Sequence, residues 1–213
     1  MKVLMMHEII DDDVVPRDSM QINYNEYALL LNKLKKNTVL SLDSFYCKFS
    51  KREFNGEYVI TFDDVHKSVY EKAYPLLISN NLPFTLFVNL GLLDTKDYIS
   101  KDQLKEMSLN SLCTIGSHGM NHVFHRKLKN KKCLEELYDS KNELEKLLNI
   151  RVNFFAFPYG SLVAVSIRNI KQVKKADYLM SFSTIPSDVS YSSLISKWFI
   201  PRINVTNKII ANI

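Results

Sequence analysis

Two patterns of hydrophobic and polar positions alternate along this chain: short apolar runs, and apolar residues spaced three and four apart. They predict β-strands that alternate with amphipathic helices. Short apolar runs rich in aromatic and β-branched residues, bounded by polar segments, are typical of buried strands. Such runs predict strands over Lys2–Met6, Tyr58–Phe62, Pro83–Val88, Cys113–Ile115, Val152–Phe157 and Tyr178–Phe182, and a last extended segment over Phe199–Val205.

Apolar residues spaced three and four apart predict a helix in most of the intervals between these strands. The helices are expected over Tyr24–Lys36, Lys67–Asn80, Lys101–Leu112, Lys131–Leu148 and Ser166–Lys175. Asn23 with Glu26 has the form of a capping pair for the first helix, and Pro75 should kink or end the second. Because strands and helices alternate, the pattern predicts an α/β fold with parallel strands joined by helices.

The size and composition of the chain fit one globular domain over residues 1–213. Its 213 residues are 46% hydrophobic, and single-domain α/β barrels commonly run to roughly 200–250 residues. The net charge of +5 comes from scattered lysines. This field would favour an anionic ligand, but it is too diffuse to indicate nucleic-acid binding, and no nucleic-acid motif is present.

Cysteine usage and the absence of long apolar runs bear on the compartment. Cys47, Cys113 and Cys133 lack metal-ligand spacing and are expected to be packed thiols in a reducing environment. No run approaches the ~20 apolar residues of a transmembrane segment, and the segment before the first polar residues is too short for a signal peptide. We therefore expect cytoplasmic residence, although a secreted form whose leader was removed would look the same.

Two adjacent carboxylates stand where the second predicted strand ends, in Thr61-Phe62-Asp63-Asp64. Such a pair indicates two tasks at one site, because one acid can hold a cation while the other moves a proton. The alternative is that Asp64 caps a helix starting near His66, which leaves Asp63 unexplained.

His118 and His122 stand four residues apart, so both imidazoles can face one side of a turn. Together with one carboxylate they would form a three-ligand site with open positions. That donor set suits zinc, and also cobalt, nickel or ferrous iron. The alternative is that the spacing of the pair is incidental.

Three further features complete the candidate site. His7 follows the first strand and could protonate a departing amine, or be a structural histidine. The turn Pro158-Tyr159-Gly160 could aim a backbone N–H at an oxyanion, or simply interrupt the chain. Arg202, a lone arginine in an apolar stretch, should pair with a carboxylate. Asp63 is one possible partner, and an ordinary structural ion pair is the alternative.

The candidate chemical residues lie at or just past the carboxyl ends of predicted strands, where parallel sheets build their sites. They are His7, Asp63, Asp64, His118 and Pro158-Tyr159. Other candidates have plainer interpretations. His66 is expected on a helix surface and His125 in a loop. Trp198 and Tyr191 could stack on a sugar ring, but core packing is the commoner fate of such aromatics.

Taken together, these motifs resemble the polysaccharide deacetylase family, the NodB-homology group of carbohydrate esterase family 4. The resemblance covers nearly the whole chain, and it implies a distorted (β/α) barrel of about seven parallel strands. It also implies that Asp63 is the general base, that Asp64, His118 and His122 bind the metal, and that the N–H of Tyr159 helps hold the oxyanion.

The opening Val3-Leu4-Met5-Met6-His7 and the closing Ile200-Pro201-Arg202-Ile203 are similar to one branch of that family. Its members are circularly permuted and act on poly-N-acetylglucosamine. This resemblance implies that His7 is the general acid, and we expect Pro158, Tyr159 and Arg202 to contact substrate.

The chain departs from the family pattern at three places. Val65 stands where glycine usually follows the acid pair, and Gly119 replaces the serine or threonine that usually follows the first metal histidine. No arginine precedes the Pro158-Tyr159 turn. These departures concern the substrate and the rate more than the three metal ligands.

The sequence therefore predicts a metal-dependent hydrolase, most simply a zinc enzyme, that removes the N-acetyl group of an N-acetylated sugar. The sugar could be linked to a nucleotide or a lipid as a precursor of a surface polysaccharide, or could belong to a polymer. Two other classes stay open: a catalytically weak or inactive carbohydrate-binding relative, and a structural protein that holds no metal.

Overall fold

A computed structural model describes residues 1–190, 197–211 and 213 of the chain. Its main sheet has the strand order β8-β7-β6-β5-β4-β1-β9, and all neighbouring strands are parallel. The strands are β1 Lys2–Met6, β4 Tyr58–Asp63, β5 Phe84–Val88, β6 Cys113–Ser117, β7 Phe154–Ala156, β8 Met180–Phe182 and β9 Ile203–Asn204. The predicted α/β fold with about seven parallel strands is confirmed.

The segment around β9 joins the two sides of the curled sheet. On one side the N–H of Ile200 donates to Ser181 O at 2.9 Å, and the N–H of Ser183 donates to Ile200 O at 2.8 Å. On the other side the N–H of Val205 donates to Met5 O at 2.9 Å. One extended segment therefore contacts both β8 and β1, and the sheet takes the form of a distorted barrel.

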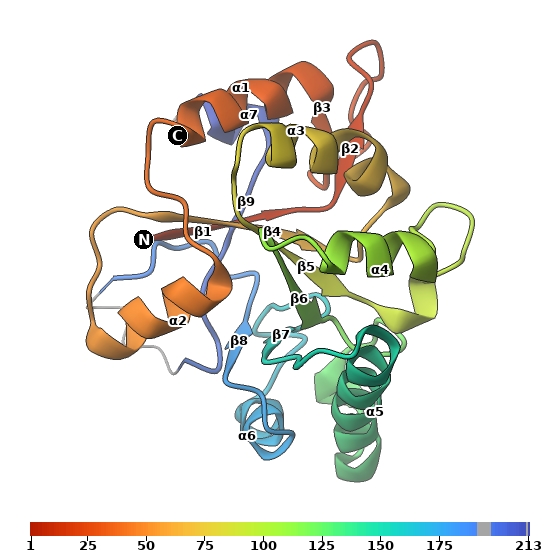
Figure 1. The fold of residues 1–213 in the computed structure, drawn as a ribbon. Coiled ribbons are helices and arrows are strands. Elements are labelled where there is room, and N and C mark those ends of the chain that lie inside the picture. The colour runs from red at the N-terminus through yellow and green to blue at the C-terminus, as the bar shows by residue number, and fades with distance from the viewer. Residues whose placement is uncertain (191–196, 212) are drawn as a thin grey trace.

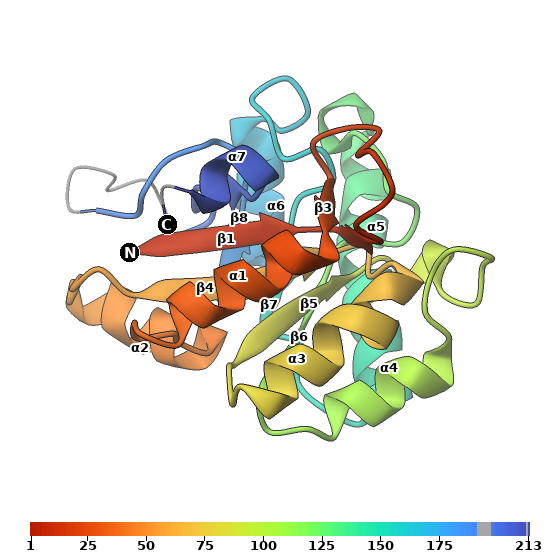
Figure 2. The same ribbon diagram turned by 90° about the horizontal axis from the view of Figure 1, so that it is seen from above.

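Helices surround the strands, as Figures 1 and 2 show. They are α1 Tyr24–Leu34, α2 Leu42–Lys51, α3 Tyr74–Ser79, α4 Lys101–Ser108, α5 Asn130–Leu148, α6 Ile167–Lys175 and α7 Asn207–Ile210. The chain also forms single turns over Val69–Ala73, Leu90–Leu92 and His125–Lys127, and a second small sheet of β2 Glu8–Ile10 and β3 Gln21–Asn23. The five predicted helices are confirmed; four have shorter bounds than predicted and α5 begins one residue earlier, whereas α2, α7 and the small sheet were not predicted.

Two predicted details of the helices can be compared with the structure. The interruption at Pro75 is confirmed, because a π-helical turn over Val69–Ala73 precedes α3 and Pro75 lies in the first turn of that helix, where a missing N–H costs little. The capping pair at Asn23 is wrong. The Asn23 side chain donates instead to the carbonyls of Asp11 and Val14, in the acidic loop before α1.

Side-chain alternation along the strands separates two cores. The outer face of the sheet packs against helices, while the inside holds a second cluster that includes Val59, Phe87 and Phe182, with Phe45 of α2. Because residues two apart share a face, the row of Val59, Thr61 and Asp63 lies on the inside. The apolar interior therefore leads to a carboxylate at the carboxyl end of β4.

Trp198 is partly buried against the outer core, as its alternative interpretation expects, while Tyr191 lies outside the described residues. In the parts of the chain that the structure covers, no helix is both long and apolar enough to cross a bilayer.

Candidate metal centre

Strand register brings the predicted site residues to one edge of the sheet. Met6 of β1 pairs with Phe62 of β4, so the next residue on each strand, His7 and Asp63, end up level with one another. On the other side, β6 ends one residue before His118. The carboxyl ends of these parallel strands thus gather side chains that are far apart in sequence, as the sequence predicted.

A tight turn lets two adjacent carboxylates serve one site. Side chains alternate in a strand, but Asp64 leaves the extended conformation with φ +60°. The N–H of Val65 donates to Asp63 O at 2.6 Å, which closes a three-residue γ-turn around Asp64. Buried Val65 also has a positive φ, +61°, which is a strained conformation for a β-branched residue. Backbone strain of this kind is typical of functional sites.

Asp64, His118 and His122 converge with a geometry that could hold a cation. Their ligand atoms lie within 4.8 Å of one another. Asp64 Oδ1 is 3.5 Å from His122 Nε2 and 3.8 Å from His118 Nε2. His118 Nδ1 lies 2.8 Å from the carbonyl oxygen of Ala156, which orients the ring and leaves Nε2 for a ligand bond. Two imidazoles and one carboxylate suit zinc and similar ions.

The protonation preferences of these residues also fit a cation. Burial lowers the pKa of His118 to about 3 and lowers that of His122, so both rings are neutral near pH 7 and can bind a metal. Burial, reinforced by the charge of Asp63, raises the pKa of Asp64 to about 7. Asp64 Oδ1 is buried and has no hydrogen-bond partner. A buried oxygen without a partner costs free energy, and a cation at this position would remove that cost.

The surroundings of Asp64 argue against the alternative that its side chain caps a helix, because Asp64 Oδ1 accepts no hydrogen bond from the described residues. Helical residues begin at Lys67, just before the π-helical turn over Val69–Ala73. The nearby Ser68 N–H donates instead to His66 Nδ1. Asp64 therefore faces the two histidines and caps no helix.

Asp63 is paired with Arg202 in a buried, two-pronged contact. Arg202 Nη1 donates to Asp63 Oδ1 at 2.7 Å, and Nη2 donates to Oδ2 at 2.6 Å. Burial alone would raise the pKa of Asp63, but the charge and hydrogen bonds of Arg202 outweigh it and hold the pKa well below its usual range. Asp63 is therefore ionised and ready to accept a proton at neutral pH.

The burial of Arg202 corrects one expectation. Its side chain is 0% exposed, and its Nε donates to the carbonyl of Ser183 at 2.9 Å while Nη1 also reaches Thr61 Oγ1 at 3.2 Å. All three guanidinium nitrogens donate hydrogen bonds to protein atoms. This arrangement does not support the predicted contact between Arg202 and substrate. The structure instead identifies Asp63 as the carboxylate partner that the sequence left open.

His7 stands beside these residues as expected for a proton donor. Its Nδ1 is buried and has no hydrogen-bond partner. Burial lowers the pKa of His7, whereas the charge of Asp63 opposes that change and favours the protonated ring. The role of His7 as general acid stays a prediction.

The turn after β7 carries an exposed aromatic residue next to the histidines. Tyr159 has φ +60° and is 46% exposed. Its ring stacks on Phe124 at 4.0 Å between centroids and meets the ring of His122 at 4.7 Å. Within the described chain the backbone N–H of Tyr159 donates to no other group, so it is available to a ligand. Pro158, just before it, is buried.

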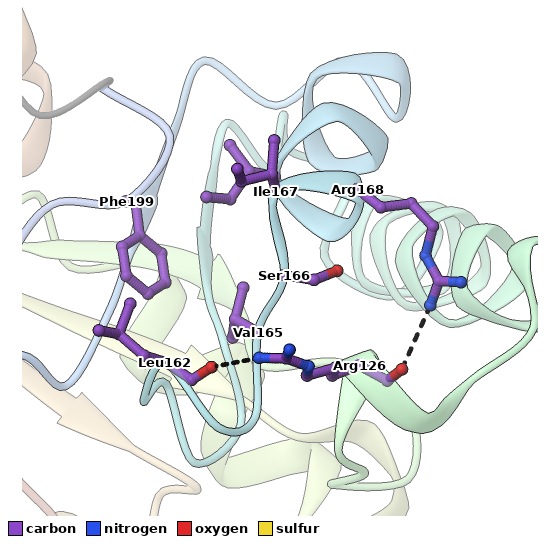
Figure 3. Close-up of a pocket in the computed structure, with 8 residues that line it drawn as sticks. Arg126, Leu162, Val165, Ser166, Ile167, Arg168 and Phe199 are labelled. Atoms are coloured by element: carbon purple, nitrogen blue, oxygen red, sulfur yellow. Dashed lines mark hydrogen bonds between the residues drawn. The ribbon is translucent and has the colours of Figure 1, made fainter.

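Two arginines hold the segment that follows His122. Arg126 Nη1 donates to the carbonyl of Leu162, in the loop that carries Tyr159, at 2.8 Å, and Arg168 Nη2 of α6 donates to the carbonyl of Arg126 at 3.3 Å (Figure 3). Both arginines line a groove with Leu162 and Phe199. The first bond connects the segment after His122 to the loop that carries Tyr159.

Sequence reasoning missed several residues that support the site. Glu136 and Asn89 hold the loop between the two histidines, and Phe124 supports Tyr159. Their only sequence signal is proximity to the motifs, because contacts between a loop and a helix depend on tertiary packing. His66, expected on a helix surface, lies just before the π-helical turn and is partly buried.

His125, expected in a loop, lies in a short 3-10 turn with its side chain 0% exposed. Its ring packs edge-on against Phe155 and Phe157, and neither ring nitrogen has a hydrogen-bond partner. Burial lowers its pKa from 6.5 to about 4. Between those two pH values the unfolded chain binds a proton that the folded chain does not, so the free energy of unfolding falls as the pH falls through this window.

The substitution His125→Phe should therefore reduce the acid sensitivity of the fold. Phenylalanine keeps a ring against Phe155 and Phe157 without a group to protonate. We expect the loss of unfolding free energy on acidification to shrink by up to about 1.4 kcal/mol per pH unit. Urea unfolding of both proteins at several pH values between about 4.5 and 6.5 measures this. Identical pH dependence in the two proteins would contradict it.

Comparisons with solved structures find this fold among deacetylases. The structure of the Streptococcus pyogenes deacetylase PplD is similar over 99% of this chain and 96% of that chain, with a TM-score of 0.85 and 22% identity. IcaB from Ammonifex degensii matches 98% of this chain and 93% of its own, with a TM-score of 0.82 and 22% identity. These likenesses establish the fold.

The chain belongs to the polysaccharide deacetylase family, whose sequence profile matches residues 52–180. It is also 29% identical over 184 residues to the poly-β-1,6-N-acetyl-D-glucosamine N-deacetylase of Staphylococcus aureus. That match covers 79% of this chain and 61% of the relative. The chain thus spans about three-fifths of the length of the curated relatives it matches.

Proposed function

We propose that this protein is a metal-dependent hydrolase that removes the N-acetyl group from an N-acetylated sugar. The observation that carries the proposal is the convergence of Asp64, His118 and His122 around an unpartnered carboxylate oxygen, with ionised Asp63 alongside. Family membership and the name of the Staphylococcus aureus relative support the reaction and the class of substrate.

The three ligands and the turn after β7 would surround the reacting amide. A divalent cation held by Asp64, His118 and His122 would act as a Lewis acid that polarises the acetyl carbonyl and acidifies the attacking water. The free N–H of Tyr159 would donate to the oxygen on which negative charge develops. Pro158, directly before Tyr159, is buried, and Tyr159 itself has φ +60°.

Asp63 and His7 divide the proton transfers between them. Asp63 takes a proton from the water whose oxygen attacks the acetyl carbon, and its pairing with Arg202 keeps it ionised for that step. When the carbon–nitrogen bond breaks, His7 gives a proton to the departing nitrogen. The products are acetate and the free amine of the sugar.

The substrate belongs to the chemistry of surface polysaccharides. The relative is named for poly-β-1,6-N-acetyl-D-glucosamine, which supports an N-acetylglucosamine unit in the substrate. This unit could be carried by a nucleotide, a lipid or a polymer. A groove lined by Arg126, Leu162 and Phe199 among others belongs to the segments that follow His122 and Tyr159 in the chain (Figure 3).

An acetate-release assay with and without a chelator tests the proposal. The substrates are acetylated sugar nucleotides, chito-oligomers and β-1,6-linked N-acetylglucosamine oligomers. We expect acetate and free amine in equal amounts, loss of turnover after chelation, and recovery on adding Zn²⁺ or Co²⁺. Turnover that survives complete removal of metal would refute the metal-dependent mechanism.

The same assay distinguishes the alternative of a non-catalytic carbohydrate-binding relative. That alternative rests on two departures from the family pattern, Val65, which adopts φ +61° beside the acid pair, and Gly119, which follows His118. It expects stoichiometric metal and sugar binding without acetate release. A protein that binds no metal at all would instead support a structural role.

A further inference from the structure

The loop that joins the two histidine ligands has little structure of its own. Residues 119–121 lie between the end of β6 and His122, outside any helix or strand. Gly119 has φ +83°, which glycine adopts readily, whereas His122 has φ +48°, a conformation that other residues rarely adopt. Something outside the loop must therefore fix the position of His122 relative to His118.

Glu136 of α5 contacts this loop through both carboxylate oxygens. Oε2 accepts hydrogen bonds from the N–H of Met120 at 3.0 Å and from the N–H of Asn121 at 3.2 Å. Oε1 accepts from Asn121 Nδ2 at 2.5 Å. One carboxylate thus binds three donors in the two residues directly before His122, and such charge-assisted hydrogen bonds are stronger than neutral ones.

The loop carbonyls are held from the opposite direction. The N–H of Leu90 donates to Gly119 O at 3.2 Å, and the N–H of Gly91 donates to Met120 O at 2.8 Å. The two donors follow β5, whereas Glu136 lies on α5. Both the N–H groups and the carbonyl groups of the loop are therefore hydrogen-bonded. Glu136 accepts from the N–H groups, and the segment after β5 donates to the carbonyls.

Helix α5 is itself attached to the strand that carries the first histidine. Ser140, one helical turn after Glu136, accepts a hydrogen bond from Ser117 Oγ at 2.9 Å, and Ser117 precedes His118. Residues four apart lie on the same helix face. One face of α5 thus fixes both ends of the segment from Ser117 to Asn121.

We infer that Glu136 is a positioning residue that holds His122 in place to bind the metal. Without its acceptor, the N–H groups of Met120 and Asn121 would turn toward water, and His122 Nε2 would lose its placement 3.5 Å from Asp64 Oδ1. A Cβ at position 119 would lie 3.6 Å from Glu136 Oε2. The inference rests on the proposed metal site.

Metal affinity, measured by competition with a chromophoric chelator, tests this role without reference to turnover. Glu136→Leu removes the acceptor, whereas Glu136→Gln keeps an oxygen that can accept from both backbone N–H groups. We expect Zn²⁺ affinity to fall roughly 10- to 100-fold in Glu136→Leu and to stay near that of the unaltered protein in Glu136→Gln. The visible spectrum of the Co²⁺-loaded proteins should change in Glu136→Leu only.

Glu135 provides the matched control on the same helix. It is partly exposed and pairs with Lys131 and Lys132 rather than with the loop. Glu135→Leu should leave both metal affinity and the Co²⁺ spectrum unchanged. Equal affinity in Glu136→Leu and the unaltered protein would overturn the inference, as would equal losses in Glu136→Leu and Glu136→Gln. Failure of the unaltered protein to bind metal would overturn the proposed metal site as well.

A second pair of variants keeps the test decisive if Glu136→Leu does not fold. Asn121 is exposed, so Asn121→Asp should fold while placing a carboxylate against Glu136. Repulsion should release the loop and weaken Zn²⁺ binding. Adding Glu136→Gln gives the new carboxylate a donor and should restore affinity. No weakening in Asn121→Asp, or no restoration in the double variant, would contradict the role of Glu136.

Discussion

Replacing Asp63 by asparagine is expected to abolish acetate release, with kcat falling by about 10²- to 10⁴-fold. The amide has nearly the shape of the carboxylate, but it cannot take a proton from the attacking water. The three ligand side chains Asp64, His118 and His122 are unaltered, so the variant should still bind one metal ion. Acetate release and metal content of the purified variant measure the two effects separately.

The pairing of Asp63 with Arg202 complicates this experiment and also suggests its control. Asparagine would leave a fully buried guanidinium without its anion, which destabilises a fold. Adding Arg202→Met removes that unpaired charge, so the double variant should recover stability but not turnover. Asp64→Asn is the complementary control and should lose the metal. If Asp63→Asn keeps a tenth or more of the turnover, Asp63 is not the base.

Replacing Arg202 by methionine should be the most destabilising of these changes. It leaves Asp63, which is 1% exposed, without its cation, and breaking a buried ion pair by removing one partner costs about 3–5 kcal/mol. The depressed pKa of Asp63 contributes stability above the unfolded-state pKa, near 4, and that stability is lost as the pH falls through the folded-state value. The difference between the two proteins should therefore be full at neutral pH and shrink in acid.

The same substitution should change how activity depends on pH. Without Arg202, burial would raise the pKa of Asp63, so a higher pH would be needed to ionise this residue. We expect the acid limb of the kcat/KM profile to move to higher pH. Urea unfolding and a pH–rate profile measure the two effects.

Arg151→Met is the control for this substitution, because Arg151 is exposed and its replacement should change stability by about 0.5 kcal/mol or less. An Arg202→Met protein as stable as the Arg151→Met protein, with an unmoved acid limb, would contradict the role assigned to the buried pair.

Much of the fold was predictable because its signals are local. The apolar run before Asp63 and the aromatic run over Phe84–Val88 have the composition of buried strands, and both form strands. The helix α2 was missed because it is rich in aromatic residues and buries only Leu42 and Phe45. Its cap at Ser41 is a weak signal beside that composition.

The candidate metal ligands were predictable because they follow strand ends in recognisable motifs, but the contacts that support them were not. The sequence pattern gives no sign that Asp64 breaks the alternation through a γ-turn, since valine follows it rather than glycine. It indicates Asp63 only as one possible partner of Arg202, because that pairing depends on how the last segment closes the sheet. The contact from Glu136 to Met120 likewise depends on where α5 packs.

The closing segment around β9 has a consequence for how the molecule matures. Arg202 lies on the stretch that hydrogen-bonds to both β8 and β1, so Asp63 gains its counter-charge only when the two margins of the sheet meet. Until then, the chain carries the two neighbouring acids Asp63 and Asp64 without the guanidinium of Arg202 beside them. Hydrolytic competence would thus be acquired last, and molecules clipped or stalled before this stretch would be inert.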